Sequence, residues 1–431
     1  MTTDPPVSRD GRLRVATVVT RLEGGAGAHA IRGVLALDRE AFEPVVITGS
    51  GCDRLLGQAA SARLPVILEP SLRAPIDLRS DARALRRLQT LLQQGGFDVV
   101  HTHCAKAGAL GRLAARRNGV PWIVHTYHGF PFHEFQSAPR RSVYVAIERR
   151  LGRLTDVTLC VGVGVAVEAI RRGLAAPERV RVIGVAVDGA GAVGPVDAAA
   201  LQQARRRARL ALGVPIEAVV VGAVGRLTYQ KAPEDFLAAL TALGRSDVVG
   251  VWVGGGELAD RVASMARSTP SVRVLLAGDR GDVPDLLPAF DVLALSSRYE
   301  GLPTILVEAM VSGVPVVATA VNAVPDVVVP GETGLLVPPG KPRLLAEAVR
   351  YLIDSPDVAA RLATEARARL GTRFTEAALR DALVAAYAGV LPRIANQSPP
   401  RTPAAGRPLA PASADPAQPL EGTGDLGMTA S

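Results

Sequence analysis

Two glutamates, Glu300 and Glu308, stand in the part of the chain whose residue types are best suited to chemistry. An ionised carboxylate only accepts hydrogen bonds, so such a pair suits a ligand rich in hydroxyl groups, such as a sugar or a ribose. Pro303 between them favours the first turn of a helix, and Gly313 favours its end. The pattern predicts a helix in which Thr304 and Glu308, four residues apart, share one face.

The segment Val292–Ser296 before this pair is short and apolar, which predicts a buried strand. Glu300 then lies in the loop at the carboxyl end of that strand, where open α/β sheets bind ligands. The N-terminus of the following helix offers free N–H groups to a phosphate. For two isolated glutamates, the alternative is an ordinary strand–helix unit whose carboxylates are solvated.

Two cations follow a second predicted strand, Ala218–Val224. Gly225 opens the turn, and Arg226 and Lys231 come directly after it. Arginine binds phosphate as a fork and lysine as a point charge, so together they could neutralise a diphosphate without a metal ion. A pair of surface charges is the alternative. Only three of the 49 basic residues are lysines, and this scarcity favours a specific role for Lys231.

The first half of the chain contributes a glycine cluster and most of the histidines. Gly24, Gly25 and Gly27 follow the first predicted strand, where they either let the backbone approach a ligand or form a plain tight turn. They are too close together for the dinucleotide pattern G-x-G-x-x-G. The spacing of the six histidines fits no helix-borne zinc motif, so no metal site is predicted. His128, at a strand end before a glycine, is the best candidate to face a cleft.

Length and composition limit the class of protein. A chain of 431 residues is too long for one typical core, which predicts two domains with tails. The formal net charge of +8 suits anionic partners, but no zinc-finger or RNA-binding signature supports nucleic acid as a partner. The three separated cysteines predict reduced thiols. No apolar run approaches the roughly 20 residues of a membrane helix, and no signal-peptide core is evident, so we expect a cytoplasmic protein.

Short Val/Ile/Leu runs alternate with longer Ala/Leu/Arg-rich segments, and the pattern restarts near residue 218. This alternation is typical of parallel βαβ units. We therefore expect an α/β chain with two Rossmann-like, doubly wound parallel-sheet domains facing a central cleft. The predicted strands are Arg14–Thr20, Pro44–Thr48, Asp98–His101, Trp122–Thr126, Val157–Val161, Ala218–Val224, Gly250–Val253, Ser271–Leu276, Val292–Ser296 and Val314–Ala318, and the predicted helices include Ala28–Leu37, Arg79–Gln94, Ala107–Arg117, Arg140–Leu154, Pro233–Ala242 and Leu286–Ala289.

Composition also sets the predicted boundaries. Residues 1–12 form a disordered lead-in, 13–190 a first domain and 191–375 a second, with a linker rich in Gly, Ala and Pro around 182–200. A C-terminal helix at 376–396 is expected to return to the first domain. Residues 397–431 hold seven prolines and no aromatic residue, so this tail is predicted to be disordered.

These motifs together resemble a known family, the retaining glycosyltransferases of family four, which have the GT-B fold. The similarity spans roughly residues 13–390, and bacterial members of the family commonly build exopolysaccharide, capsule or other surface glycans. The matching segments are Gly225–Leu227 with Lys231, Ser297–Pro315, Thr333–Pro339, His101–Ala115 and Gly119–His133.

The resemblance implies that the first domain binds the acceptor and the second the donor, a nucleotide sugar that is a co-substrate, and that the enzyme needs no cofactor. Arg226 and Lys231 would bind the donor diphosphate. Glu300 would contact the donor sugar and Glu308 the ribose. With His128, which would lie near the reacting sugar, Arg226, Lys231 and Glu300 are the expected catalytic residues.

The same resemblance extends the expected donor-binding set. Gly25 would face the phosphates and the acceptor from the glycine loop. Gly301, Leu302 and Thr304 complete the set beside Glu300.

Four positions depart from the family pattern. Gly162 stands where a serine is usual, and Ala323 stands where a glycine is usual. Asp326 replaces a glutamate. The interdomain segment Val185–Asp188 lacks the usual Asn-Gly, which removes a residue that commonly allows positive φ.

We therefore expect a retaining, metal-independent glycosyltransferase in surface polysaccharide synthesis, with a glycan or lipid-linked acceptor. The basic stretch Arg79–Leu88 suggests peripheral contact with an anionic membrane at its inner face. The alternatives are a degenerate, non-catalytic GT-B scaffold that binds a nucleotide sugar or a partner, and a nucleotide-sugar epimerase, which shares the two-domain cleft.

Overall fold

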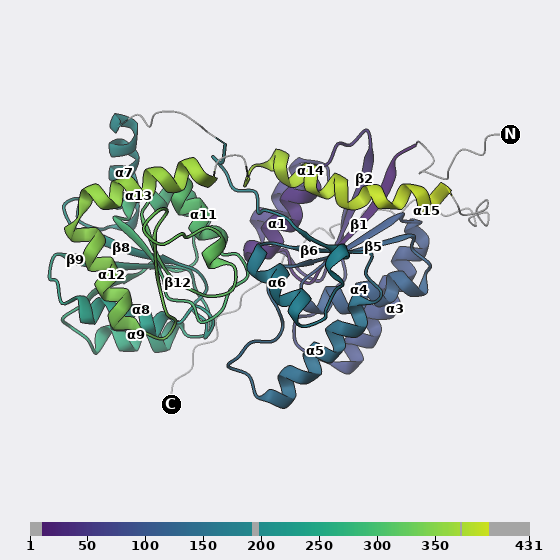
Figure 1. Ribbon diagram of the computed structural model, residues 1–431, viewed down its shortest axis with the longest axis horizontal. Coiled ribbons are helices and arrows are strands. Elements are labelled where there is room, and N and C mark those ends of the chain that lie inside the picture. The colour runs from purple at the N-terminus through teal and green to yellow at the C-terminus, as the bar shows by residue number, and fades with distance from the viewer. Residues whose placement is uncertain (1–10, 192–197, 371–372, 396–431) are drawn as a thin grey trace, which may run out of the picture.

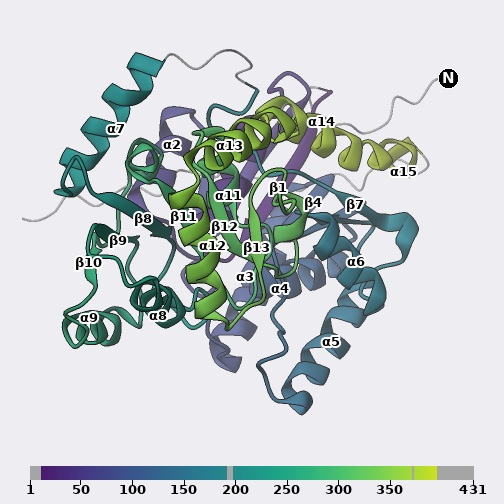
Figure 2. The ribbon, with the colours of Figure 1, turned by 60° about the vertical axis from the view of Figure 1, so that its left-hand side comes forward.

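The computed structural model describes residues 11–191, 198–370 and 373–395. They form two domains side by side, each built on a parallel sheet with helices packed against it (Figures 1 and 2). The predicted fold class is therefore confirmed. Most of the predicted lead-in, the centre of the predicted linker and the Pro-rich tail lie outside the described residues.

The first domain carries a seven-stranded parallel sheet in the order β3-β2-β1-β4-β5-β6-β7. Its strands are β1 (Leu13–Val19), β2 (Phe42–Thr48), β3 (Val66–Leu68), β4 (Val99–His103), β5 (Trp122–Tyr127), β6 (Val157–Cys160) and β7 (Val180–Val182). Its helices are α1 (Gly24–Leu35), α2 (Asp53–Ser61), α3 (Leu78–Gly95), α4 (Ala105–Arg117), α5 (Ala138–Gly152) and α6 (Val163–Arg171), with a 3-10 turn at Pro177–Arg179.

The second domain carries a six-stranded parallel sheet in the order β10-β9-β8-β11-β12-β13. Its strands are β8 (Val219–Val224), β9 (Val248–Val253), β10 (Arg273–Leu276), β11 (Val292–Leu295), β12 (Val316–Thr319) and β13 (Leu335–Val337). Its helices are α7 (Ala198–Leu212), α8 (Pro233–Leu243), α9 (Ala259–Arg267), α10 (Val283–Leu286), α11 (Thr304–Val311), α12 (Pro342–Asp354) and α13 (Pro356–Leu370).

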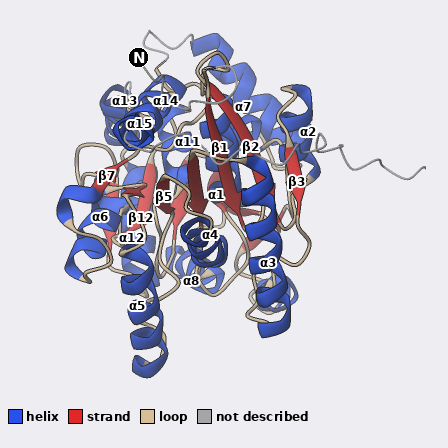
Figure 3. Cartoon of the chain, turned by 90° about the vertical axis from the view of Figure 1, so that its right-hand side faces the viewer, coloured by secondary structure: helices blue, strands red, loops and turns tan. Residues whose placement is uncertain are grey.

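Helices cover both faces of the first sheet (Figure 3), and alternate side chains of its strands pack against them. Ala16 and Val18 of β1 pack in one cluster with residues of α3 and α4, while Val15 and Val19 pack in clusters on the other face. Because successive side chains of a strand point to opposite faces, a nearly continuous apolar run is needed when both faces are covered.

The strand order reverses at one place in each sheet, between β1 and β4 and between β8 and β11. At such a switch point the connections leave toward opposite faces, and a crevice opens at the carboxyl ends of the strands. The glycine cluster follows β1, the Arg226–Lys231 turn follows β8 and the Glu300 loop follows β11. Topology therefore places all three predicted motifs at the two crevices.

The chain returns to the first domain after α13. Helices α14 (Glu376–Tyr387) and α15 (Leu391–Ala395) lie over that domain in Figure 1. Leu379, Leu383 and Tyr387 pack with Val15 and Val99 of its sheet. The hydroxyl of Tyr387 also lies 2.7 Å from Nδ1 of His101, which fixes the helix over β4.

The sequence missed several short elements. The three-residue strands β3, β7 and β13 were not predicted, because an edge strand of that length has no measurable alternation. Pro303 was expected as the first helical residue of α11, but it is the N-cap residue, with φ −73° and ψ 110°. No helix among the described residues is both long and apolar enough to cross a bilayer.

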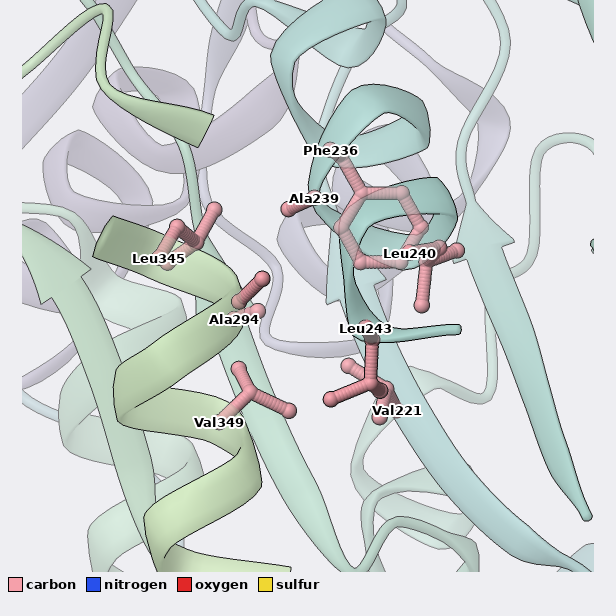
Figure 4. A pocket seen from close by; sticks show the side chains of 9 residues that line it. Val221, Phe236, Ala239, Leu240, Leu243, Ala294, Leu345 and Val349 are labelled. Carbon is pink, nitrogen blue, oxygen red and sulfur yellow. The ribbon is translucent and has the colours of Figure 1, made fainter. Parts of the chain in front are cut away.

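A cavity of about 10 Å³ lies between the second sheet and helices α8 and α12 (Figure 4). Its walls come from apolar side chains, including Phe236, Leu240 and Val349. A space of about one water molecule with no polar partner stays dry, so it is a packing gap in the core and no ligand site.

Candidate active site between the domains

Glu300 is held from several sides at the carboxyl end of β11. Its side chain is almost fully buried, and Lys231 Nζ and Ser297 Oγ both donate to its Oε1 at 2.5 Å. Gln230 Nε2 donates to Oε2 at 3.2 Å, and the backbone N–H of Glu300 donates to Asn322 Oδ1 at 2.9 Å. The carboxylate is thus oriented by the protein, and Oε2 retains capacity to accept a further hydrogen bond.

Arg226 and Lys231 differ in their surroundings. Lys231 is largely buried in its ion pair with Glu300, whereas Arg226 is exposed. Among the described residues, no hydrogen bond or ion pair engages the Arg226 side chain, so its guanidinium is available to an anion. Burial raises the pKa of Tyr299, the charge of Glu300 adds to the rise, and the charge of Arg226 opposes it.

The two domains meet backbone to backbone beside Glu300. A Cβ added at Gly301 would lie 1.6 Å from the carbonyl oxygen of His128, so no larger residue fits in this arrangement. Gly129, with φ of +151°, faces Gly301 from the first domain. A Cβ added at Gly25 would lie 3.7 Å from Thr304 Oγ1, so the glycine cluster faces the N-terminus of α11. Two pairs of predicted site residues, His128 with Gly301 and Gly25 with Thr304, are therefore brought together across the domain boundary.

Apolar packing continues from this contact. Leu302, the remaining predicted residue of the loop, is buried in a cluster that also contains Ile305. Tyr127 and Phe132 of the first domain belong to the same cluster. Leu302 thus helps to hold the domains together, and its side chain is not exposed to the cleft.

Four of the histidines, His101, His103, His125 and His128, are paired with one another or with hydroxyl groups. Nδ1 of His103 lies 2.9 Å from Nε2 of His128, and His101 and His125 bond to hydroxyl groups of Thr126 and Thr102. Burial lowers the pKa of His128 well below its ordinary value, so this ring is neutral near pH 7. Within the described residues, no group of three or more His, Cys, Asp or Glu side chains is arranged to hold a metal ion.

Glu308 lies one helical turn after Thr304 on α11, and both are half-buried. Burial raises the pKa of Glu308 above its ordinary value, the nearby charge of Asp188 adds to this rise, and Arg32 and Arg54 oppose it. Arg32 and Arg54 belong to α1 and α2 of the first domain.

Three of the departures from the family pattern lie against one another at this boundary. A Cβ added at Gly162 would lie 2.5 Å from Asp326 Oδ2 and 2.6 Å from the Cβ of Ala323. The carboxylate of Asp326 accepts a hydrogen bond from the N–H of Gly164 at 3.2 Å, which caps the N-terminus of α6 from the other domain. Gly162, the N-cap residue of α6, has no side chain that could cap the helix, and Asp326 supplies a cap across the interface.

The interdomain segment Val185–Asp188, the fourth departure from the family pattern, is well packed. Val185, Ala186 and Val187 are buried, and Asp188 accepts a hydrogen bond from Arg32 at 2.6 Å. Ala186 does not adopt positive φ, so the glycine usual in the family is not required at this position.

Comparison with known proteins shows the family of this chain. Residues 23–189 match the family model "Glycosyltransferase Family 4", and residues 205–369 match "Glycosyl transferases group 1". D-inositol 3-phosphate glycosyltransferase of Saccharomonospora viridis is 32% identical over 73% of this chain and 75% of its own length. The chain belongs to the group 1/family 4 glycosyltransferases.

Another relative of this glycosyltransferase is the Escherichia coli UDP-Gal:alpha-D-GlcNAc-diphosphoundecaprenol alpha-1,3-galactosyltransferase. It is 33% identical over 59% of this chain, and the match spans 65% of the relative. Among solved structures, Anabaena Alr3699/HepE in complex with UDP and glucose superposes with a TM-score of 0.74 at 19% identity, covering 88% of this chain and all of that one. Sucrose-phosphate synthase of Thermosynechococcus elongatus superposes with a TM-score of 0.73 at 20% identity, covering 88% and 100%. These structures support the GT-B fold.

Sequence reasoning missed several residues of the glycosyltransferase site. Gln230 directly precedes Lys231, and Ser297 begins the segment Ser297–Pro315, but the sequence did not predict that both side chains bond to Glu300. Asn322 has a φ of +45°, which is uncommon for a residue with a side chain and is a signal of a constrained site once a structure exists. His133 stacks on Tyr299 across the cleft, with ring centroids 4.1 Å apart.

The contact between His128 and Gly301 yields a direct test of domain closure. Gly301→Ala should force the two loops apart, so amides of the Gly129–Glu134 loop should exchange with deuterium about tenfold faster, as measured by mass spectrometry. Gly57→Ala in α2 is the control, because nothing lies within 4 Å of its added Cβ. Equal exchange in wild type and Gly301→Ala would contradict the closed contact.

Proposed function

We propose that this glycosyltransferase transfers a sugar from a nucleotide-diphosphate donor to a glycan or lipid-linked acceptor in surface polysaccharide synthesis, with retention of configuration and without a metal ion. The observation that carries the proposal is the oriented Glu300 with Lys231 at one side and the N-terminus of α11 beside it. This arrangement combines an acceptor for sugar hydroxyls with cations and free N–H groups for phosphates.

The donor fits the cleft as follows. Arg226 and Lys231 bind the diphosphate, the free N–H groups at the start of α11 add to them, and Glu308 accepts from the ribose. The bond between C1 and the phosphate oxygen breaks as the acceptor oxygen bonds to C1, and the diphosphate gains negative charge. Fixed cations aimed at that charge lower the barrier, so no metal ion is needed.

Retention is part of the proposal, with Glu300 as a hydrogen-bond acceptor for the donor sugar and with attack from the leaving-group face. Oε1 of Glu300 accepts from Lys231 and Ser297, and we assign Oε2 to a hydroxyl of the donor sugar, so the proposed route uses the carboxylate as a held acceptor and not as the nucleophile. The acceptor hydroxyl then attacks on the face from which the diphosphate leaves, and its proton passes to a diphosphate oxygen. His128, which is neutral, hydrogen-bonds the donor sugar from the first domain.

The donor and acceptor classes draw support from the relatives. The Escherichia coli relative is named for transfer from UDP-galactose to a lipid diphosphate-linked sugar, and the Anabaena structure holds UDP. The relatives named above act in glycosyl transfer, which favours this proposal over an epimerase. The Asp326 cap on α6 and the buried linker favour it over a degenerate scaffold, because they preserve domain packing despite the departures.

A peripheral contact with an anionic membrane at its inner face is part of the proposal. The apolar side of α3 is buried through Ala84 and Leu88, which leaves its arginines exposed on the other side. Ile76 and Leu78, at 70% and 83% exposed, stand at the start of that helix. Exposed aliphatic side chains next to exposed arginines suit a surface of anionic headgroups.

Loss of either cation should weaken donor binding. Arg226→Met and Lys231→Met should each reduce the affinity for UDP about 10- to 100-fold, since a charge-assisted hydrogen bond contributes about 1.5–3 kcal/mol. Isothermal titration calorimetry measures this, with Lys341→Met as the matched control on the same domain. Unchanged UDP affinity in both variants, or an equal fall in the control, would refute the diphosphate site.

The raised pKa of Glu308 predicts a pH dependence. The ionised carboxylate accepts from the ribose hydroxyls, so UDP affinity should fall as the pH drops toward the raised pKa, above the ordinary 4.5. UDP itself gains and loses protons in this range, so UDP affinity is compared between wild type and Glu308→Gln at each pH from about 5 to 8. The variant should bind more weakly at high pH, and the two proteins should converge at low pH. Parallel curves would exclude Glu308 from the ribose site.

The membrane contact is tested by cosedimentation with vesicles. The wild-type protein should pellet with vesicles that contain phosphatidylglycerol and remain free with purely zwitterionic vesicles. Leu78→Glu should lower the bound fraction several-fold, because it places a negative charge at the surface. Leu344→Glu, at a 40% exposed position of the second domain, is the control. Equal binding to both vesicle types would exclude the electrostatic contact.

A further inference from the structure

His103 and His128 form a pair of rings at the carboxyl ends of β4 and β5. Nδ1 of His103 lies 2.9 Å from Nε2 of His128, and the two ring planes are 26° apart with their centroids 5.2 Å apart. The rings therefore meet edge to edge, as a hydrogen bond between two imidazoles requires. A neutral imidazole has one protonated and one unprotonated nitrogen, so one ring of the pair donates and the other accepts.

Burial indicates which ring of the pair donates. Among the described residues, no hydrogen bond engages Nε2 of His103 or Nδ1 of His128, the nitrogens on the outer sides of the pair. If His128 donated, the proton of His103 would lie on Nε2 of a residue that is 2% exposed, and an N–H group without a partner is costly there. If His103 donates, the proton of His128 lies on Nδ1 of a half-buried residue. The second arrangement costs less.

The ring of His103 is held by a second ring that is itself fixed. His101 packs against His103, with centroids 4.2 Å apart and planes 36° apart. Both nitrogens of His101 bond to hydroxyl groups, Nδ1 to that of Tyr387 and Nε2 to that of Thr126, each at 2.7 Å. A turned-over ring at His103 would put a carbon in the place of Nδ1, so this packing preserves the bond to His128.

A third ring packs against His128 without bonding to it. His29 of α1 lies with its centroid 5.1 Å from that of His128 and its plane at 78° to it. Nδ1 of His29 is buried and has no partner among the described residues. His29 thus restricts the ring of His128 by packing, and the hydrogen bond that decides where the proton of His128 lies comes from His103.

We propose that His103 is a positioning residue for His128: its Nδ1–H donates to Nε2 of His128 and keeps the proton of His128 on Nδ1. His128 then presents an N–H donor, and not a lone pair, to an oxygen of the donor sugar. A donor on the first domain complements Glu300 of the second, which as a carboxylate only accepts. This role rests on the function proposed above, since it assigns the atom with which His128 meets the sugar.

Nitrogen NMR of the imidazole rings tests the position of the proton in the free protein. The full chain is labelled with nitrogen-15 in its histidine rings, and the signals missing from the spectrum of His128→Gln identify those of His128. Near pH 7, Nε2 of His128 should resonate as an unprotonated nitrogen and Nδ1 as a protonated one. A protonated Nε2, or signals averaged between the two forms, would overturn the proposal.

Two substitutions separate the hydrogen bond of His103 from its packing. His103→Leu removes the donor, so His128 should sample both positions of its proton. The affinity for a UDP-sugar should then fall about five- to tenfold, the effect of one hydrogen bond, while the affinity for UDP alone stays unchanged. His103→Asn places an amide donor near the position of Nδ1 and should restore most of the loss. Calorimetry with UDP, UDP-glucose and UDP-galactose measures these affinities.

His125→Leu is the matched control. His125 is also buried and lies 2.9 Å from the hydroxyl of Thr102, but no hydrogen bond among the described residues joins it to His128. This variant should keep the wild-type ratio of UDP-sugar affinity to UDP affinity. An equal change of that ratio in the control, or an unchanged ratio in His103→Leu, would overturn the proposal. If no UDP-sugar binds to the wild-type protein, the proposed donor is wrong, and the NMR spectrum of the free protein still decides the role of His103.

Discussion

The backbone contact between His128 and Gly301 is the constraint on which the cleft depends. Two loops at strand ends approach so closely that a single methyl group would not fit between them. This contact limits how closely the loops after β5 and β11 approach each other, and Gly25 faces Thr304 across the same boundary. Apolar packing around Leu302 and the Asp326 cap on α6 stabilise the same arrangement from neighbouring positions.

Glu300 is the side chain that this geometry holds in place for the proposed contact with the donor sugar. Its oxygens receive bonds from Lys231, Ser297 and Gln230, residues of two different loops of one domain, and its backbone is fixed by Asn322. A carboxylate oriented in this way loses little freedom when it accepts a sugar hydroxyl, which is the benefit of preorganisation. The residues proposed to bind the donor sugar and the donor diphosphate meet at this side chain, through the bond from Lys231 to Glu300.

The sequence predicted the two parallel sheets because long apolar strands and intervening helices leave a clear pattern. It also predicted the loops that carry Arg226, Lys231 and Glu300, because each motif follows a strand directly. It could not predict that Lys231 pairs with Glu300, since 69 residues separate them and only the pairing of β8 with β11 brings their loops together. Nor could it predict that Gly162, Ala323 and Asp326 compensate one another, because that relation exists only across the closed interface.

The most direct test of the central claim is turnover of a panel of UDP-sugars by the purified chain, with UDP release and the configuration of the released sugar followed by NMR. We expect slow hydrolysis of one UDP-sugar, and the sugar released first should keep the anomeric configuration of the donor. Glu300→Gln should abolish this turnover. No UDP release from any donor by a correctly folded chain would contradict catalysis and favour a binding scaffold. Release of the opposite anomer first would contradict the retaining route.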